Sequence, residues 1–292
     1  MMQQRAVIRR AMRRSVVYAS FRTAAIGFLA GLAACAGRAV QSDPAPGGSN
    51  GGAAATVNVV SYNIRHGRGM DDRVDIARTA AVVRELAPDI VGLQEVDVGV
   101  ERSGRINEPE EMGQLLGMKH AFGSFFDYQG GQYGMAILSR FPVLRSESIR
   151  LPDGNEPRVA LAVEIDHPAI GRLMVVNVHF DWVADDGFRF AQATRLTTFL
   201  DSLTIPFILL GDFNDTPGSR TLALFTQRAF EARKPADDHL TFSSTKPEKE
   251  IDFIFGSPAA RWSASSVRVI TEPVASDHRP VTAVLAFAPP AR

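Results

Sequence analysis

Apolar runs of strand length recur along most of the chain. Several runs are nearly continuous and rich in β-branched residues, which is typical of strands covered on both faces. Others, at 158–165, 172–179 and 281–287, alternate apolar and polar positions more clearly. The pattern predicts strands at 56–62, 89–96, 134–139, 158–165, 172–180, 206–212, 251–255, 267–271 and 281–287.

Segments with the 3.6-residue periodicity of helices lie between these strands. They are 72–86, 109–116, 188–203 and 219–225. Asp72 is expected to cap the first helix, and Pro88 ends it soon after its last apolar position. Strands and helices in this mixed order predict an α/β domain in which two sheets pack together with helices outside.

The first 34 residues have a different pattern. They contain six Arg and no acidic residue, and they end in an apolar run at 24–34. This is typical of an export signal, and the run is too short for a permanent transmembrane helix. The segment "LAAC", from Leu32 to Cys35, resembles the lipobox of bacterial lipoproteins, in which the cysteine is acylated after cleavage. The alternative is an ordinary signal with an incidental cysteine.

Composition divides the rest of the chain into a linker and one domain. Residues 35–55 are mainly Gly, Ala, Pro and Ser after the cysteine, which predicts a flexible linker. Residues 56–288 have the size of one large α/β domain. Without the signal, 26 basic and 32 acidic residues remain, a formal charge of −6. Such a balance argues against a protein that works by binding nucleic acid backbones. Cys35 is the only cysteine, so no intramolecular disulfide forms.

Polar side chains follow the predicted strands where the chain leaves the core. In "FILLGDFND", for example, a buried run ends in Asp212 and Asn214. Polar groups at strand ends collect along one edge of a layered sheet, the usual place for a site. Carboxylates and amides without cysteine favour a hard cation over structural zinc. The candidate residues are Asn63, Glu95, His179, Asp212, Asn214, Asp252, Asp277 and His278.

Taken in order, the segments that carry these residues resemble the endonuclease/exonuclease/phosphatase superfamily. That superfamily includes pancreatic-type deoxyribonuclease, abasic-site endonucleases, neutral sphingomyelinases and inositol polyphosphate phosphatases. The segments span nearly the whole domain and are VVSYNIRHG, PDIVGLQEVD, YGMAILSRFP, VNVHF, LLGDFND, IDFIF and SDHRPV. Each alone has a structural alternative, such as a turn-forming Asp-Asn pair. Together they imply the family's four-layer α/β/β/α sandwich, in agreement with the strand pattern.

The resemblance implies a divalent metal, Mg²⁺ or Mn²⁺, and residues that hold it. Glu95 matches the carboxylate that binds the metal, Asn63 the amide beside it, and Asp277 a further metal-associated carboxylate. Asn63 and Arg158 are also predicted to contact substrate, because both side chains donate hydrogen bonds to phosphate oxygens. A surface position at the start of a strand is the alternative for Arg158. The chain departs from many relatives at Met135, where they carry Asn.

The resemblance also implies catalytic residues. Asp212 matches the residue that activates or positions the attacking water, and Asn214 the one that orients the phosphate. His278 and Asp252 match a paired imidazole and carboxylate, with Asp252 orienting the ring. His179 matches a residue that stabilises developing charge or protonates the leaving group. These residue types suit phosphodiester hydrolysis, which needs an in-line water, charge relief at the phosphoryl oxygens and a proton for the leaving oxygen.

The sequence therefore predicts a monomeric, exported, metal-dependent phosphoesterase, anchored through acylated Cys35 to the bacterial cell envelope on its periplasmic or outer face. The anchor and the negative charge favour a lipid headgroup or another small phosphodiester as substrate. One alternative is an extracellular nuclease of the same superfamily. Another, from a different class, is a catalytically inactive lipoprotein that binds a phosphate ligand. The inactive protein would lack a metal or catalytic residue, and none of the eight is missing.

Overall fold

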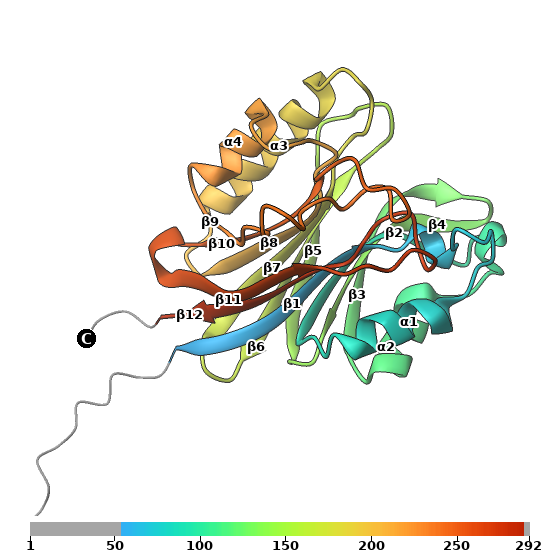
Figure 1. The fold of residues 1–292 in the computed structure, drawn as a ribbon, viewed down its shortest axis with the longest axis horizontal. Helices are drawn as coiled ribbons and strands as arrows, with labels where there is room; N and C mark the ends of the chain where they lie inside the picture. Colours follow the sequence, from blue (N-terminus) through green and yellow to red (C-terminus); the bar gives the residue numbers. More distant parts are fainter. Residues whose placement is uncertain (1–53, 289–292) are drawn as a thin grey trace, which may run out of the picture. The chain divides into compact units, whose positions relative to one another are not determined.

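Two six-stranded sheets face each other in the computed structural model, which describes residues 54–288, and helices cover their outer faces. Helices α1 and α2 cover one sheet, and α3 and α4 cover the other (Figure 1). The predicted four-layer α/β/β/α sandwich is thus confirmed. The helices are α1 (Ile76–Glu85), α2 (Glu108–Leu116), α3 (Gly187–Asp201) and α4 (Arg220–Thr226). None of these helices is long and apolar enough to cross a bilayer.

The first sheet has the strand order β11-β12-β1-β2-β4-β3, and the second has the order β5-β6-β7-β8-β10-β9. The centre of each sheet is a parallel pair, β1 with β2 and β7 with β8, and every other pairing is antiparallel. The bounds are β1 (Ala55–Asn63), β2 (Ile90–Val98), β3 (Lys119–Tyr128), β4 (Gly131–Ser139), β5 (Val143–Arg150), β6 (Val159–His167), β7 (Gly171–His179), β8 (Phe207–Asp212), β9 (Phe230–Glu231), β10 (Asp252–Ser257), β11 (Trp262–Val269) and β12 (Val281–Phe287).

Burial on both faces explains the continuous apolar runs. In β7, Leu173 and Val175 pack into the core between the sheets. Met174 and Val176 point the other way and pack under α3 and α4. A third apolar cluster lies between the first sheet and α1 and α2. Because successive side chains of a strand alternate between faces, a central strand between two cores needs apolar residues on both faces.

A buried amide joins the two sheets near the middle of the sandwich. Asn177 on β7 is fully buried, and its Nδ2 donates to the carbonyl oxygens of Leu93 and Ala136, each at 2.9 Å. Its Oδ1 accepts a hydrogen bond of 2.7 Å from Nε2 of Gln94. A buried polar group must be hydrogen-bonded, and this amide keeps its hydrogen bonds only in one packing arrangement of the two sheets.

Three strands were not predicted from the pattern. β3 carries the aromatic stretch around Phe125 and Phe126, in which only alternate residues are buried. β5 is exposed along most of its length and lies at the edge of its sheet, so its residues are polar. β9 is only two residues long. Edge strands need few apolar residues, so the pattern of apolar and polar positions does not reveal them.

The N-terminus of α1 differs from the prediction. Asp75, not Asp72, is the N-cap, and its side chain accepts a hydrogen bond of 2.9 Å from the backbone N–H of Arg78. Asp72 lies in a turn with φ of 61° and pairs with Arg68. The predicted signal peptide, the lipobox at Leu32–Cys35 and nearly all of the predicted linker lie outside the described residues. Ala55, the last linker residue, already belongs to β1.

Candidate active site

Three side chains lie side by side at one edge of the second sheet. His179 is the last residue of β7, Asp212 is the last of β8, and Asp252 is the first of β10. In the sheet register, His179 is opposite Asp212, and Asp212 is opposite Asp252. Because β10 runs antiparallel to β8, its start falls where the two parallel strands end. Strand pairing therefore brings these distant residues together.

The first sheet contributes its own strand ends to the same place. Asn63 ends β1, and its Nδ2 donates to Oδ2 of Asp212 at 3.2 Å and to Oε1 of Glu95 at 3.0 Å. The hydroxyl of Ser276 donates to the carbonyl oxygen of Asn63 at 2.7 Å, which holds the segment before β12 beside the end of β1. This places Nε2 of His278 at 3.6 Å from Oδ2 of Asp212. The two sheets thus meet at Asp212.

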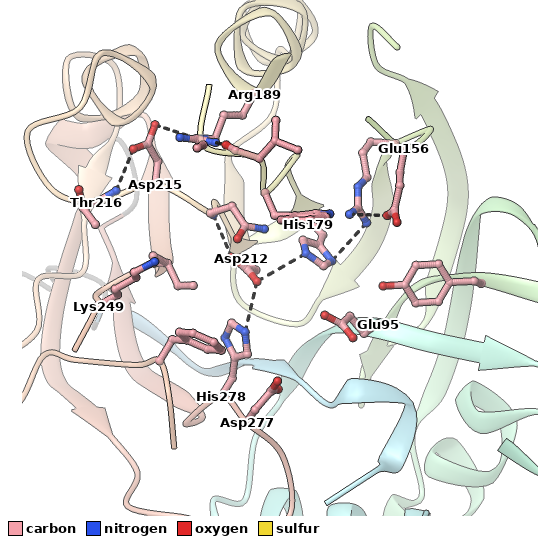
Figure 2. Close-up of a pocket in the computed structure, with 18 residues that line it drawn as sticks. Glu95, Glu156, His179, Arg189, Asp212, Asp215, Thr216, Lys249, Asp277 and His278 are labelled. Carbon is pink, nitrogen blue, oxygen red and sulfur yellow. Dashed lines mark hydrogen bonds and ion pairs between the residues drawn. The ribbon is translucent and has the colours of Figure 1, made fainter. Parts of the chain in front are cut away.

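Asp212 is the centre of the group (Figure 2). Its Oδ2 lies 3.6 Å from Nε2 of His179 and 3.6 Å from Nε2 of His278, and its Oδ1 accepts the backbone N–H of Asn214 at 2.9 Å. The residue is 1% exposed, and burial raises the pKa of its carboxyl group to about 7. A carboxyl group that titrates near neutrality can exchange protons at physiological pH.

His278 is held between two carboxylates. Its Nδ1 lies 3.1 Å from Oδ2 of Asp252, and its other nitrogen faces Asp212. Burial alone would lower the pKa of His278, but the charges of Asp252 and Asp212 outweigh burial and raise the pKa to about 10. The ring also packs against Phe242, with centroids 4.9 Å apart. The expected pairing of Asp252 with His278 is present, and it keeps this imidazole protonated.

His179 has the opposite electrostatic environment. Burial lowers its pKa well below the usual value, and the positive charges of Arg158 and His278 lower it further. NH1 of Arg158 lies 3.5 Å from Nδ1 of His179. A guanidinium only donates hydrogen bonds, so Nδ1 accepts and the proton of the neutral ring is on Nε2, facing Asp212. The site therefore holds one neutral and one charged imidazole on either side of one carboxyl group.

Backbone geometry directs Glu95 into the cleft. The register of β2 on β4 shifts between Gln94 and Val96, so Glu95 is the extra residue of a β-bulge. Its φ of 56° lies in the left-handed region that non-glycine residues rarely adopt. Asn214 has a similar φ of 50°. Bulges re-aim side chains, and strained backbone of this kind clusters at functional sites.

Arg158 is buried and belongs to the site. It is 2% exposed, so the surface alternative for it is excluded. Its NH2 donates to Oε2 of Glu156 at 2.9 Å, and its guanidinium stacks over the ring of Phe125 at 4.8 Å. Met135, where relatives carry Asn, is buried in the core between the sheets. Met135 itself does not line the cleft.

Asp212, Asp252 and His278 form a buried group that can hold a metal ion. One ligand atom from each lies within 4.8 Å of the other two. Oδ1 of Asp252 is buried and has no hydrogen-bond partner in residues 54–288, so it is available as a donor atom. The proton on His278 competes with any cation at this place, because the imidazolium already compensates the two carboxylates.

The predicted ligands Glu95, Asn63 and Asp277 form a second oxygen-rich group beside the first. Burial raises the pKa of Glu95, the hydrogen bond from Asn63 opposes this effect, and the charge of Asp277 raises the pKa further. Nε of Arg65, 3.7 Å from Oδ2 of Asp277, compensates part of the charge. Carboxylates that repel each other gain from a bound cation. Oxygen donors of this kind fit a hard divalent ion such as Mg²⁺ or Mn²⁺.

These groups lie in or next to one cleft with a volume of about 660 Å³. Of the nine predicted site residues, Glu95, Arg158, His179, Asp212, Asn214, Asp277 and His278 line it. Asn63 and Asp252 lie behind the lining and contact Asp212 or His278. The structure therefore brings all nine together, and it leaves their individual roles as predictions.

Sequence reasoning missed several residues of the cleft. Glu156 pairs with Arg158, and Arg189 on α3 pairs with Asp215, with Nε of Arg189 3.2 Å from Oδ2 of Asp215 (Figure 2). Trp182 also lines the cleft. Asp215 directly follows Asn214 and could have been included on that ground. The other residues have no pattern that marks them, because the cleft wall is built from loops and a helix far apart in sequence.

Comparison with known proteins agrees with this architecture. The model of the Endonuclease/Exonuclease/phosphatase family matches residues 60–278. The uncharacterized protein YbhP of Escherichia coli (strain K12) is 27% identical over 240 residues, which cover 77% of this chain and 94% of YbhP.

Solved structures share the fold. An endonuclease/exonuclease/phosphatase from Beutenbergia cavernae superposes with a TM-score of 0.65 at 23% identity, covering 81% of this chain and 73% of the other. A mannosyl-6-phosphatase from Bacteroides thetaiotaomicron superposes with a TM-score of 0.65 at 20% identity, covering 79% of this chain and 100% of the other. With the family match and the buried site together, the chain belongs to the endonuclease/exonuclease/phosphatase family and is a hydrolase of the phosphoesterase and nuclease type.

Proposed function

We propose that the protein hydrolyses a phosphodiester by in-line attack of water with a divalent cation, and that its substrate is a lipid headgroup or another small phosphodiester. The observation that carries this proposal is the buried Asp212, which lies 3.6 Å from a neutral and from a charged imidazole and whose pKa is near 7. Such a group suits the activation of water at physiological pH.

Each residue has a role that follows from its surroundings. Asp212 accepts the proton of the attacking water. His278, kept protonated by Asp252, stabilises negative charge on the phosphoryl group. His179 donates a hydrogen bond from Nε2 to the leaving oxygen and stabilises the negative charge with which that oxygen departs. Asn214, whose Nδ2 is anchored on the carbonyl oxygen of Phe180 at 3.0 Å, orients the phosphate, and so does Arg158. Asn63 fixes the position of Asp212.

A divalent cation would be held by Glu95 and Asp277 with the amide of Asn63. When bound, Mg²⁺ or Mn²⁺ supplies positive charge for the phosphoryl oxygens without a protonation requirement. The alternative place for a cation is the group of Asp212 and its neighbours described above. Glu95 and Asp277 are favoured because no protonated imidazole bridges them.

The cleft favours a small substrate over a nucleic acid. Five carboxyl side chains, three Arg or Lys side chains and the protonated His278 line it. Arg158 and Arg189 are already paired with Glu156 and Asp215. A nucleic acid gains affinity from unpaired basic side chains along its binding path, and this cleft has few of them. The related mannosyl-6-phosphatase also favours a small phosphoester. An extracellular nuclease remains the second candidate, because the family includes nucleases.

We also propose that the protein acts from a membrane surface as a monomer. Acylation of Cys35 would anchor it after export to the periplasmic or outer face of the bacterial envelope, with the Gly- and Pro-rich linker as a tether. An anchor holds the cleft near lipid headgroups at a high effective concentration.

The test measures turnover of bis-p-nitrophenyl phosphate and p-nitrophenyl phosphate with Mg²⁺, with Mn²⁺ and with EDTA. Asp212→Asn keeps the size of the side chain but removes its basicity, and we expect it to lower kcat by at least about 100-fold. Asp201→Asn, an exposed position on α3, is the matched control. Metal-dependent diester turnover that only Asp212→Asn abolishes supports the proposal. No turnover, together with no binding of Mg²⁺ or Mn²⁺ by calorimetry, would leave the ligand-binding alternative.

A further inference from the structure

An exposed tryptophan stands at the mouth of the cleft. Trp182 lies three residues after His179, in the connection between β7 and α3, and it lines the cleft. It is 58% exposed, more than any other large apolar side chain in residues 54–288. The other tryptophan of the chain, Trp262, is buried. Leaving more than half of an indole in water has a free-energy cost.

The backbone on both sides of Trp182 is held by buried polar groups. The carboxylate of Asp181 is fully buried and accepts hydrogen bonds from the backbone N–H of Asn155 at 2.6 Å and of Val183 at 3.1 Å. The backbone N–H of Asp181 donates to Oε1 of Gln192 at 2.9 Å. These contacts fix the loop before any ligand arrives.

Arg189 strengthens the same loop and joins it to the catalytic side of the cleft. Its NH1 donates to the carbonyl oxygen of Val183 at 2.5 Å, and its Nε lies 3.2 Å from Oδ2 of Asp215. Asp215 follows Asn214, which contacts Asp212. The backbone that carries Trp182 is therefore held at a set position relative to the phosphate site, so binding need not order this loop.

We propose that Trp182 selects the organic group of the substrate by stacking its indole face on a ring, a nucleobase or a sugar, that is joined to the scissile phosphate. This proposal rests on the proposed function, since it takes the phosphate to lie at Asp212. An exposed indole on a fixed backbone suits stacking on flat rings, whatever their chemical identity. The small number of unpaired cations in the cleft fits a single phosphate with one attached ring.

The test compares two diesters with the same leaving group, thymidine 5′-(p-nitrophenyl phosphate) and methyl p-nitrophenyl phosphate. The readout is the ratio of their kcat/KM values in the full-length protein with Mg²⁺. Because a stacked base contributes about tenfold or more, we expect Trp182→Ala to lower the ratio about tenfold. Trp182→Phe should restore most of it. Trp262→Phe is the control and leaves the ratio unchanged. An unaltered ratio in Trp182→Ala overturns the proposal.

A binding measurement separates this proposal from the proposed function. Tryptophan fluorescence is followed while thymidine 5′-phosphate, glucose 6-phosphate or glycerol 3-phosphate is added. We expect quenching by one or both ring-bearing phosphates, retained in Trp262→Phe and absent in Trp182→Phe. The two ring-bearing compounds distinguish a base from a sugar. Quenching without hydrolysis of any diester refutes the proposed function alone. No quenching by ring-bearing phosphates, or a response only to phosphatidylcholine vesicles, overturns the stacking role.

Discussion

At the scale of single residues, the site is a balance of charges that burial makes strong. Asp212 and Glu95 have raised pKa values, His278 has a raised pKa and His179 a lowered one. The residue types and their positions after strands could be predicted from the sequence. The protonation states could not, because they depend on which buried groups face each other across the two sheets. Burial could not be predicted either. Arg158 stands at the start of a strand, where an arginine is expected at the surface, and yet it is buried.

The metal can be tested at Glu95. Glu95→Gln removes one of two repelling carboxylates and keeps the shape of the side chain. We expect its melting temperature in EDTA to match or exceed that of the native protein, because the cost of burying the charge is removed. We also expect the stabilisation by Mg²⁺ to disappear and kcat/KM to fall by at least about 100-fold. Thermal melts with and without Mg²⁺ measure this. Unchanged stabilisation by Mg²⁺ would place the ion at Asp212 and its neighbours.

The charge of His278 predicts how stability depends on pH. The pKa of His278 is about 10 in the folded protein and about 6.5 when unfolded, so the folded state binds this proton more tightly. Its contribution to stability is complete below about pH 6.5 and is lost as the pH rises towards 10. In EDTA, we expect the free energy of unfolding to fall more steeply over this range in the native protein than in His278→Gln.

Urea unfolding at several pH values between 6 and 10 tests the effect. His120→Gln, an exposed position in β3, is the control and should follow the native protein. Parallel curves for the native protein and His278→Gln would contradict the charged state of this imidazole.

At the scale of elements, two kinds of strand behave differently. Central strands such as β7 and β8 have apolar residues on both faces and could be located from the sequence. The edge strand β5 could not, because its exposed residues have no apolar pattern. The bulge at Glu95 was equally hidden, since a register shift depends on pairing with β4 and leaves the apolar run of β2 intact. Sequence thus locates a strand better than it locates its irregularities.

Asn177 tests the connection between the sheets. Asn177→Ala leaves the carbonyl oxygens of Leu93 and Ala136 and the amide of Gln94 without this partner inside the sandwich. We expect a loss of roughly 2–4 kcal/mol in the free energy of unfolding. Asn107→Ala, which removes the N-cap of α2 and an exposed hydrogen bond to Glu110, should cost about 1 kcal/mol. Urea unfolding compares them, and an equal or smaller loss for Asn177→Ala would refute the role of this amide.

At the scale of the whole molecule, fold class was predictable because motifs and strand pattern agree along the entire domain. The substrate was not predictable, because the cleft wall comes from loops whose residues share no pattern.

The membrane anchor can be tested independently of the fold. We expect full-length Cys35→Ser, made in a bacterial host, to move from the membrane fraction to the soluble fraction, since the acylated thiol would be absent. An unchanged membrane fraction would contradict lipidation. Fractionation with immunodetection measures this.

The strand order has a consequence for the newly made chain. All strands of the second sheet come from one continuous stretch, β5 to β10, whereas the first sheet needs β11 and β12 from the end of the chain beside β1. Asp277 and His278 lie just before that last strand. A nascent or truncated chain that ends before residue 276 has no imidazole beside Asp212 from this segment, whatever else has folded. Under the proposed function, we therefore expect a chain without this segment and β12 to be inactive even if the second sheet has folded.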